Sequence, residues 1–303
     1  METANAPRKK KSFAAIVLYF TLGAFALVGL AQVLGSFLPD QVAASGDKVG
    51  VVEVQGIITD SKEIVRQLNK YRKDSSVKGI ILRINSPGGA VAPSQEIYNE
   101  ILKIRDEKKV IASMGSLAAS GGYYIASAAN HIVANPGTLT GSIGVIMASS
   151  NIQQLLGKIG VRSQVIKSGK FKDAGSPLRP MTPAERQLLQ NVLDDVHQQF
   201  AEAVSKARNL PMEKVRELAD GRIFTGRQAL EFDLVDQLGG FEDCIDLLMQ
   251  LMDMKIRPKV IQEKEPRRLL DWLLEGFSST YISDKIYPYY GYTPNLQYIW
   301  YLQ

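Results

Sequence analysis

Two residues whose side chains can act together stand out in this sequence, a serine among small residues and a lysine downstream of it. Ser120 lies in the run Ser-Leu-Ala-Ala-Ser-Gly-Gly-Tyr-Tyr at residues 116–124, and Lys172 lies in Ser-Gly-Lys-Phe-Lys-Asp at residues 168–173. A serine hydroxyl attacks a carbonyl carbon effectively only when a neighbouring base accepts its proton. A lysine amine can be that base when burial or nearby cations favour its neutral form, since an unperturbed lysine has a pKa of about 10.4. The pair therefore predicts a serine protease that works by a Ser-Lys dyad.

The identity of the base has alternatives in the sequence. If the stretch around Lys172 is extended, Lys170 shares a face with it, and the charge of one ammonium would favour deprotonation of the other. His131 follows the run after Ser120, and His197 lies on a later predicted helix. Both histidines are expected to be structural or exposed, but the spacing alone leaves a serine–histidine pair open.

A second group of residues could stabilise the negative charge that forms when a serine attacks. Residues 85–89 read Asn-Ser-Pro-Gly-Gly directly after an apolar run. Glycines at a strand end allow a ligand to approach the backbone closely. The N–H groups of Gly88 and Gly121 would then form an oxyanion hole with two donors. The alternatives are a plain β-turn at residues 86–89 and a purely structural helix cap at Ser120.

The composition argues against several other kinds of site. The single cysteine, Cys244, allows no intrachain disulfide and no thiolate cluster, and its apolar surroundings predict a core position. With only two histidines a zinc site is not expected, and we expect neither a metal nor a cofactor. The net charge is +5, of which the first eleven residues carry +3, so the remainder is too weakly basic to predict nucleic-acid binding.

An uncharged stretch near the N-terminus predicts contact with a lipid bilayer. It covers residues 12–39 and follows a basic cluster at residues 8–11. This stretch is longer than the roughly 20 residues that a helix needs to cross a membrane. Because basic flanks stay on the cytoplasmic side, residues 1–11 are expected in the cytoplasm and everything after Asp40 outside it. A cleaved secretory signal is the alternative, but its apolar core is usually shorter.

The remainder predicts one α/β domain between a connector and a tail. Residues 40–47 form the connector, residues 48–258 the protease domain, and residues 259–303 an aromatic-rich tail that would lie at a bilayer interface or on a partner subunit. Strand patterns alternate with helical patterns, which favours a largely parallel sheet. The expected strands are 50–55, 78–85, 110–113 and 132–134, and the expected helices are 63–73, 94–108 and 121–129. Capping boxes at Thr182 and Thr225 predict two further helix starts.

Several short motifs of this chain resemble those of signal peptide peptidase A, a family of membrane-anchored bacterial serine proteases. The resemblance covers about residues 49–254 and is to the short, single-domain form of the family. The motifs occur in order at residues 83–89, 116–124, 139–146, 167–173, 176–177, 219–222 and 226–229. Each motif is weak alone, whereas their order and spacing together are specific. The tail beyond about Lys259 does not follow the family pattern.

The resemblance implies a role for each candidate residue. Ser120 would be the nucleophile, Lys172 the general base, and the N–H groups of Gly88 and Gly121 the oxyanion hole. The implied fold is a crotonase-like, Clp-protease-like αββ superhelix, preceded by one N-terminal transmembrane helix. The implied assembly is a bowl-shaped homo-oligomer in which the serine and the lysine come from adjacent subunits.

The function expected from these features is that of a membrane-anchored serine endopeptidase. Its implied substrates are hydrophobic peptides, notably signal-peptide remnants. Its expected location is the cytoplasmic membrane of a bacterium, with the catalytic domain on the extracytoplasmic side. A crotonase-like enzyme that binds acyl-coenzyme A and a catalytically weak membrane scaffold ring are the alternatives. The combination of Ser120 and Lys172 argues against both, and the predicted anchor argues further against the acyl-coenzyme A enzyme.

Overall fold

The structure, a computed structural model of the 303-residue chain, describes residues 23–24, 27, 47–263 and 297–299. The chain divides into two compact units, Met1–Gly46 and Asp47–Gln303. In the first unit, the three described residues are helical. Apart from these three, the predicted anchor at residues 12–39 lies outside the described part, as does most of the connector. None of the described helices combines the length and apolar character needed to span a membrane.

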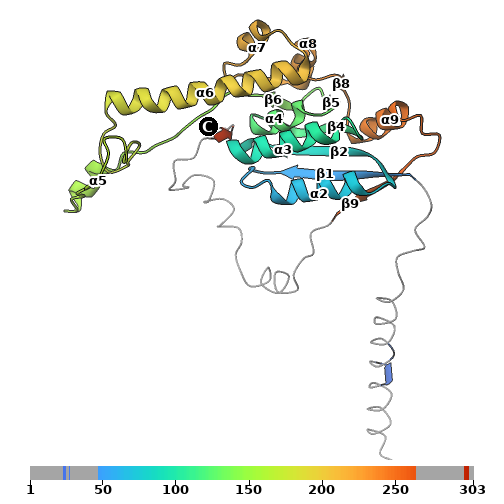
Figure 1. The fold of residues 1–303 in the computed structure, drawn as a ribbon, viewed down its shortest axis with the longest axis horizontal. Helices are drawn as coiled ribbons and strands as arrows, with labels where there is room; N and C mark the ends of the chain where they lie inside the picture. Colours follow the sequence, from blue (N-terminus) through green and yellow to red (C-terminus); the bar gives the residue numbers. More distant parts are fainter. Residues whose placement is uncertain (1–22, 25–26, 28–46, 264–296, 300–303) are drawn as a thin grey trace, which may run out of the picture. The chain divides into compact units, whose positions relative to one another are not determined.

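The second unit is built on a sheet of eight strands (Figure 1). Six of them follow the order β7-β6-β4-β2-β1-β9, while β5 pairs with β4 and β8. Every pairing is parallel except that of β6 with β7, which confirms the predicted α/β core with a largely parallel sheet. The strands are β1 (Lys48–Gln55), β2 (Val77–Ser86), β4 (Lys109–Ala119), β5 (His131–Ala134), β6 (Leu139–Gly141), β7 (Ile223–Thr225), β8 (Gln237–Leu238) and β9 (Lys259–Gln262).

Eight helices are described in this unit, and two of them begin at the predicted capping boxes. Thr182 caps α6 together with Glu185, and Thr225 caps α8 together with Gln228, each by reciprocal side-chain and backbone hydrogen bonds. The helices are α2 (Lys62–Lys73), α3 (Val91–Ile104), α4 (Gly121–Ser127), α5 (Gln153–Lys158), α6 (Pro183–Arg208), α7 (Met212–Leu218), α8 (Gly226–Glu231) and α9 (Phe241–Leu251).

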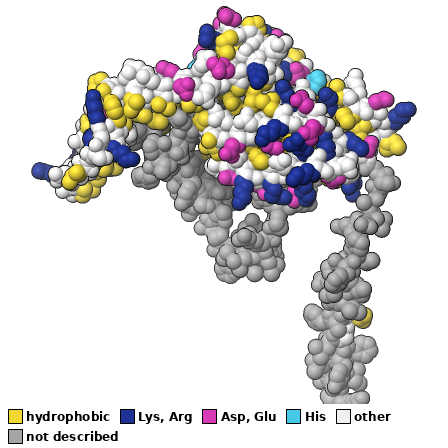
Figure 2. Space-filling view, viewed as in Figure 1, with side chains coloured by type: hydrophobic (Ala, Val, Ile, Leu, Met, Phe, Trp, Pro, Cys, Tyr) yellow, Lys and Arg dark blue, Asp and Glu magenta, His cyan; other side chains and the backbone are white. Residues whose placement is uncertain are grey.

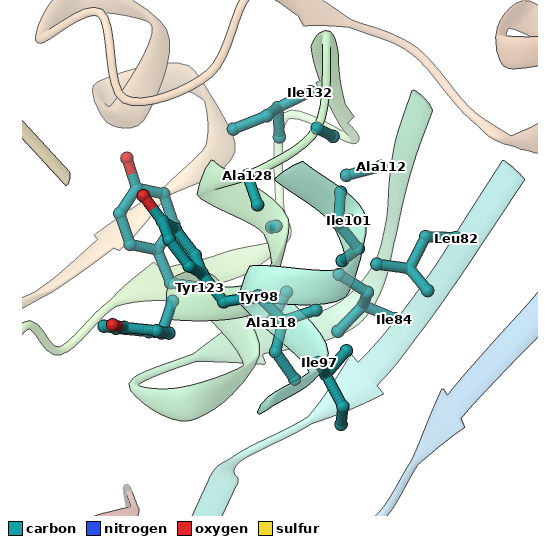
Figure 3. Packing of buried hydrophobic residues seen from close by; sticks show 14 of the residues in the cluster. Leu82, Ile84, Ile97, Tyr98, Ile101, Ala112, Ala118, Tyr123, Ala128 and Ile132 are labelled. Atoms are coloured by element: carbon teal, nitrogen blue, oxygen red, sulfur yellow. The ribbon is translucent and has the colours of Figure 1, made fainter. Parts of the chain in front are cut away.

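Alternate residues of the central strands face two separate cores. The larger core joins one face of the sheet to α2, α3, α4 and α6, and the smaller core joins the other face to α9. In β1, for example, Val52 and Val54 belong to the larger core, whereas Val49 and Val51 belong to the smaller one. Figure 3 shows side chains of β2, β4 and α3 packed together in the larger core, among them Leu82, Ile84, Ala112, Ala118, Ile97 and Ile101.

The structure differs from the sequence prediction around the candidate residues. The strand predicted at residues 110–113 extends to Ala119, because the small residues expected to form a turn pair with β6 and β2 instead. The predicted turn at residues 86–89 is divided between the end of β2 and β3 (Gly88–Ala90). The helix predicted at residues 94–108 runs from Val91 to Ile104. As a result, Ser120 directly follows β4, and the glycine segment with Gly88 directly follows β2.

One part of the unit, residues 144–184, contributes no buried residue to either core, and only Val145 of it packs against the larger core. We call it the arm. None of its residues is buried, and the first half of α6 beyond it is mostly exposed until Val196 joins the larger core. Figure 1 shows α5 and the start of α6 extending past the edge of the sheet. Hydrophobic side chains gather on the arm and the start of α6 (Figure 2), and the exposed ones include Leu155, Ile159, Val161, Val165, Ile166, Phe171, Leu188 and Val192.

Candidate active site

Ser120 occupies the junction between β4 and α4, in an unusual backbone conformation. Its φ is 53° and its ψ is −117°. Two hydrogen bonds hold the residue there: its N–H donates to the Gly141 carbonyl at 2.8 Å, and its own carbonyl accepts from the Tyr124 N–H at 2.8 Å. A non-glycine residue with positive φ is strained, and such strain is typical of functional sites, including the sharp strand-to-helix turns that carry serine nucleophiles.

The strain at Ser120 predicts an unusual effect on stability. We expect Ser120→Gly to be more stable than Ser120→Ala by about 1–2 kcal/mol, because glycine tolerates this conformation and alanine does not. At Asn191, an exposed position in the middle of α6, the same pair of replacements should have the opposite order, since glycine weakens a helix interior. Chemical denaturation of the four variants measures both differences. Equal stability of the two Ser120 variants would show that the conformation costs nothing.

The Ser120 hydroxyl is enclosed but has no hydrogen-bond partner among the described residues. Ser120 is 1% exposed, and its Oγ makes no hydrogen bond to any described residue. Consequently neither His131 nor His197 serves it as a base within one chain. A buried hydroxyl without a hydrogen bond is uncommon and calls for an explanation. A group beyond the described residues, such as a base or a substrate, would supply the missing contact.

The structure brings the two predicted oxyanion-hole segments together. A Cβ placed on Gly121 would lie 3.2 Å from the Gly88 Cα, 3.2 Å from the Gly89 nitrogen and 2.8 Å from the Ser94 Oγ. A Cβ on Gly122 would lie 2.9 Å from the Ser86 carbonyl oxygen. Side chains at these two positions would force the segments apart. The glycines after Ser120 therefore permit the close approach of α4 to the loop between β2 and β3.

The Gly88 N–H, which the sequence interpretation took as free, already has an acceptor. It donates to the Ser86 Oγ at 3.0 Å, and the Ser86 hydroxyl in turn donates to the Gly56 carbonyl at 2.6 Å. Ser86 and Ser94 are both fully buried, and sequence reasoning assigned neither of them to the site. Ser86 could have been recognised as a site residue, because it lies in the same short motif as Gly88, directly before Pro87. The contact of Ser94 comes from helix packing and has no local signal.

Lys172 lies on the arm and does not contact Ser120. Its side chain is exposed, and it sits in a series of turns in which its N–H donates to the Gly169 carbonyl at 3.2 Å. The suggestion that Lys170 and Lys172 share one face assumed an extended chain, and the turns remove its basis. Within a single chain, therefore, the two predicted members of the dyad are not hydrogen-bonded.

The three lysines of this loop differ in their surroundings. Lys167 pairs with Asp173 and also donates to the Lys170 carbonyl at 3.1 Å. The Lys170 amine lies 5.1 Å from the centre of the Phe171 ring. The Lys172 amine has neither a hydrogen bond nor an ion pair with any described residue. Of the three, only Lys172 presents an amine without a partner.

An extended segment of the chain pairs with the strand that carries Gly88. The last described residues form β10 (Gln297–Ile299), which is antiparallel to β3 and places Ile299 opposite Gly88 and Tyr298 opposite Gly89. Strand β3 can therefore accept an antiparallel partner along this edge. The described residues of the predicted tail thus form two strands, since β9 at its start joins β1 in the large sheet.

The described residues offer little for metal or thiol chemistry. Among them, no three histidine, cysteine, aspartate or glutamate side chains are grouped so as to hold a metal ion. Cys244 is fully buried, as predicted, and burial raises the pKa of its thiol to about 11. A thiol in this state is protonated at neutral pH and packs as part of the smaller core.

Comparison with known proteins places this arrangement among proteases. The model of peptidase family S49 matches residues 103–255, and the model of the Clp protease family matches residues 48–140. A Synechocystis sp. protein named "Putative protease" is 44% identical over 228 residues, covering 73% of this chain and 82% of that protein. "Putative signal peptide peptidase SppA" of Enterococcus faecium is 36% identical over 82% of this chain and 74% of its own length. The chloroplastic serine protease SPPA of Arabidopsis thaliana is 35% identical over 77% of this chain but only 35% of its own length.

Proposed function

This chain belongs to peptidase family S49 and is a serine peptidase with a Clp-protease-like α/β fold, and we propose that Ser120 is its nucleophile and Lys172 its general base. The observation that carries this proposal is the Ser120 hydroxyl, which is buried, unpartnered and held on a strained turn between β4 and α4. Both residues lie within the stretch that matches the family. Family membership favours peptide hydrolysis over acyl-coenzyme A chemistry and over a scaffold role.

The dyad is completed by a second copy of the chain. No described residue of the same chain forms a hydrogen bond with the Ser120 hydroxyl, and Lys172 presents its amine on an exposed arm. The arm and the start of α6 carry exposed apolar side chains that nothing in the described part of the chain covers, and a neighbouring subunit would bury them. Burial at such an interface would also favour the neutral amine that a general base requires. The protein accordingly acts as a homo-oligomer in which each site takes its serine and its lysine from different subunits.

The reaction follows from this arrangement. Ser120 Oγ attacks the carbonyl carbon of the substrate while its proton passes to the Lys172 amine of the neighbouring copy. The N–H groups of Gly88 and Gly121 stabilise the oxyanion that results. A charged oxygen is a stronger acceptor than a hydroxyl, so it can replace Ser86 Oγ at the Gly88 N–H. The lysine ammonium then protonates the leaving amine, and water hydrolyses the acyl-enzyme by the reverse sequence of proton transfers.

The substrates are hydrophobic peptides such as remnant signal peptides, bound in an extended form. The support for extended binding is the pairing of β10 with β3, because backbone hydrogen bonds of an added strand do not depend on sequence. A substrate on this edge would take the place of β10. Residues 12–39 anchor the protein in the bacterial cytoplasmic membrane, and the protease domain at residues 48–258 faces the extracytoplasmic side. The anchor would keep the site close to peptides released into the bilayer.

Cleavage of a short apolar fluorogenic peptide by the full-length protein in detergent tests this function. We expect wild-type protein to cleave it and Ser120→Ala to show only background hydrolysis. The matched control is Ser75→Ala, because Ser75 is exposed in the loop before β2 and takes no part in the proposed site. Unchanged cleavage by Ser120→Ala would refute the nucleophile assignment. Preferential cleavage of strongly charged peptides would refute the substrate class.

A further inference from the structure

The loop that carries Lys172 is organised around one guanidinium group, that of Arg179. Its Nε donates to the Asp173 Oδ2 at 2.8 Å, and a second nitrogen donates to the Asp173 carbonyl at 3.3 Å. On its other side the same guanidinium pairs with both carboxylate oxygens of Glu185, one of them at 2.9 Å. Arg179 therefore joins the residue directly after Lys172 to the first turn of α6.

The partners of Arg179 are themselves fixed in place. The Glu185 side chain is 3% exposed and accepts the Thr182 N–H at 2.8 Å, as part of the capping box that begins α6. The Asp173 side chain is 12% exposed and also pairs with Lys167. These bonds hold both carboxylates in the ionised form: the guanidinium lowers the pKa of Asp173, and it lowers that of Glu185 to about 2 with help from the Thr182 N–H. All these contacts lie within one chain, so none of them requires a second subunit.

Asp173 is also the carboxylate best placed to interfere with Lys172. It is adjacent in sequence, and a carboxylate that reached the amine would stabilise its protonated form, which cannot act as a base. In the structure the carboxylate is taken up by Arg179 and Lys167, while the Lys172 amine remains unpaired. The charged groups that these contacts bring together around the loop are Lys167, Lys170, Asp173 and Arg179 of the arm and Glu185 of α6.

We propose that Arg179 is a positioning residue for the dyad, which fixes the Lys172 loop on α6 and keeps Asp173 from pairing with the Lys172 amine. This inference rests on the proposed role of Lys172. It assigns two separable effects to one side chain. Fixing the loop affects the rate at every pH, because a displacement of about 1 Å can lower a catalytic rate by roughly 10²-fold. Keeping the Asp173 carboxylate paired with Arg179 affects the pH at which the Lys172 amine becomes active as a base.

The two effects can be separated by variants of Arg179 and Asp173, assayed by peptide hydrolysis over a range of pH. For Arg179→Ala we expect a lower kcat and a rising limb of the pH profile that moves to higher pH by about one unit, since Asp173 keeps only Lys167 as a partner and can also pair with Lys172. For Arg179→Lys we expect the wild-type limb with a reduced kcat, because lysine still neutralises Asp173 but cannot bridge two carboxylates. In Arg179→Ala/Asp173→Asn the limb should return to its wild-type position.

Controls distinguish positioning from a general loss of structure. Arg186→Ala removes an exposed arginine of the same turn of α6 that makes no ion pair with any described residue, and it should retain wild-type kinetics. Sizing of each variant reports assembly. If Arg179→Ala does not assemble, the test rests on Arg179→Lys, which retains the positive charge. A wild-type kcat of Arg179→Lys would overturn the inference. A limb that stays shifted in the double variant would also overturn it.

Failure of this inference differs from failure of the proposed function. If Lys172→Ala is inactive while the Arg179 variants have wild-type profiles, the dyad stands and only the role of Arg179 is wrong. If Lys172→Ala keeps its activity, the dyad itself is wrong, whatever the Arg179 variants show.

Discussion

Lys172→Ala is expected to lower kcat for peptide hydrolysis by about 10²–10⁴-fold, the range that a general base contributes to catalysis. The amine is proposed to take the proton of Ser120 during attack and to return it to the leaving group, so its loss slows both halves of the reaction. The proposed substrate-binding edge of β3 is unaffected, and KM should therefore change by no more than about twofold. Steady-state kinetics with an apolar fluorogenic peptide measures both quantities.

The matched control for this prediction is Lys158→Ala. Lys158 is an exposed lysine on α5 in the same arm, without an ion pair to any described residue. Its loss should leave kcat within about twofold, as is usual for a surface substitution. A parallel fall in the two variants would mean that the arm needs its positive charge rather than one particular amine. Near-normal turnover of Lys172→Ala at neutral pH would contradict the dyad.

Much of what positions Ser120 could be predicted from local sequence. The continuous apolar runs of β1 and β2 are typical of strands buried on both faces, and the capping boxes at Thr182 and Thr225 define two helix starts. These features depend only on neighbours in sequence, which is why they were predicted correctly. The length of β4 was underestimated because four of the five residues 115–119 are glycine, serine or alanine, and small residues are common in turns. They form a strand because β6 and β2 supply partners on both sides.

The contacts of the candidate site depended on tertiary packing. The glycines at 88, 121 and 122 indicated a close approach of backbones, and the structure shows one between α4 and the loop before β3. The hydrogen bond from the Gly88 N–H to the Ser86 hydroxyl could not be predicted, because Ser86 reaches that N–H only through the turn that joins β2 to β3. The pairing of β10 with β3 joins residues about 200 positions apart, and no local pattern specifies it.

Lys172 marks the limit of reasoning from one chain. Its residue type and motif suggested a base, but its neighbours in the folded chain are only those of an exposed loop. Arg179 and Glu185, which order that loop, lie six and twelve residues beyond Asp173. In the sequence, charged residues at such spacing do not differ from those of ordinary surface ion pairs. In the proposed dyad a surface of another subunit brings the amine to the hydroxyl, and the sequence of one subunit specifies that surface only indirectly.

A shared site has a consequence that no site within one chain would have: two inactive variants should restore activity when they assemble together. Ser120→Ala retains a normal Lys172, and Lys172→Ala retains a normal Ser120. In a cyclic assembly of equal parts in random order, about a quarter of the sites would combine an intact serine with an intact lysine from the neighbour. If the dyad lay within one chain, no site in the mixture would be complete.

The most direct test of the shared dyad is therefore the peptidase activity of particles that contain both variants. Ser120→Ala and Lys172→Ala would be co-expressed with different affinity tags and purified on both tags in sequence. As controls, each variant would be paired with Ser120→Ala/Lys172→Ala, which leaves every site without a serine or without a lysine. We predict that the mixed particles recover about a quarter of the wild-type kcat while both controls stay at background. Background activity in verified mixed particles would contradict a site built from two subunits.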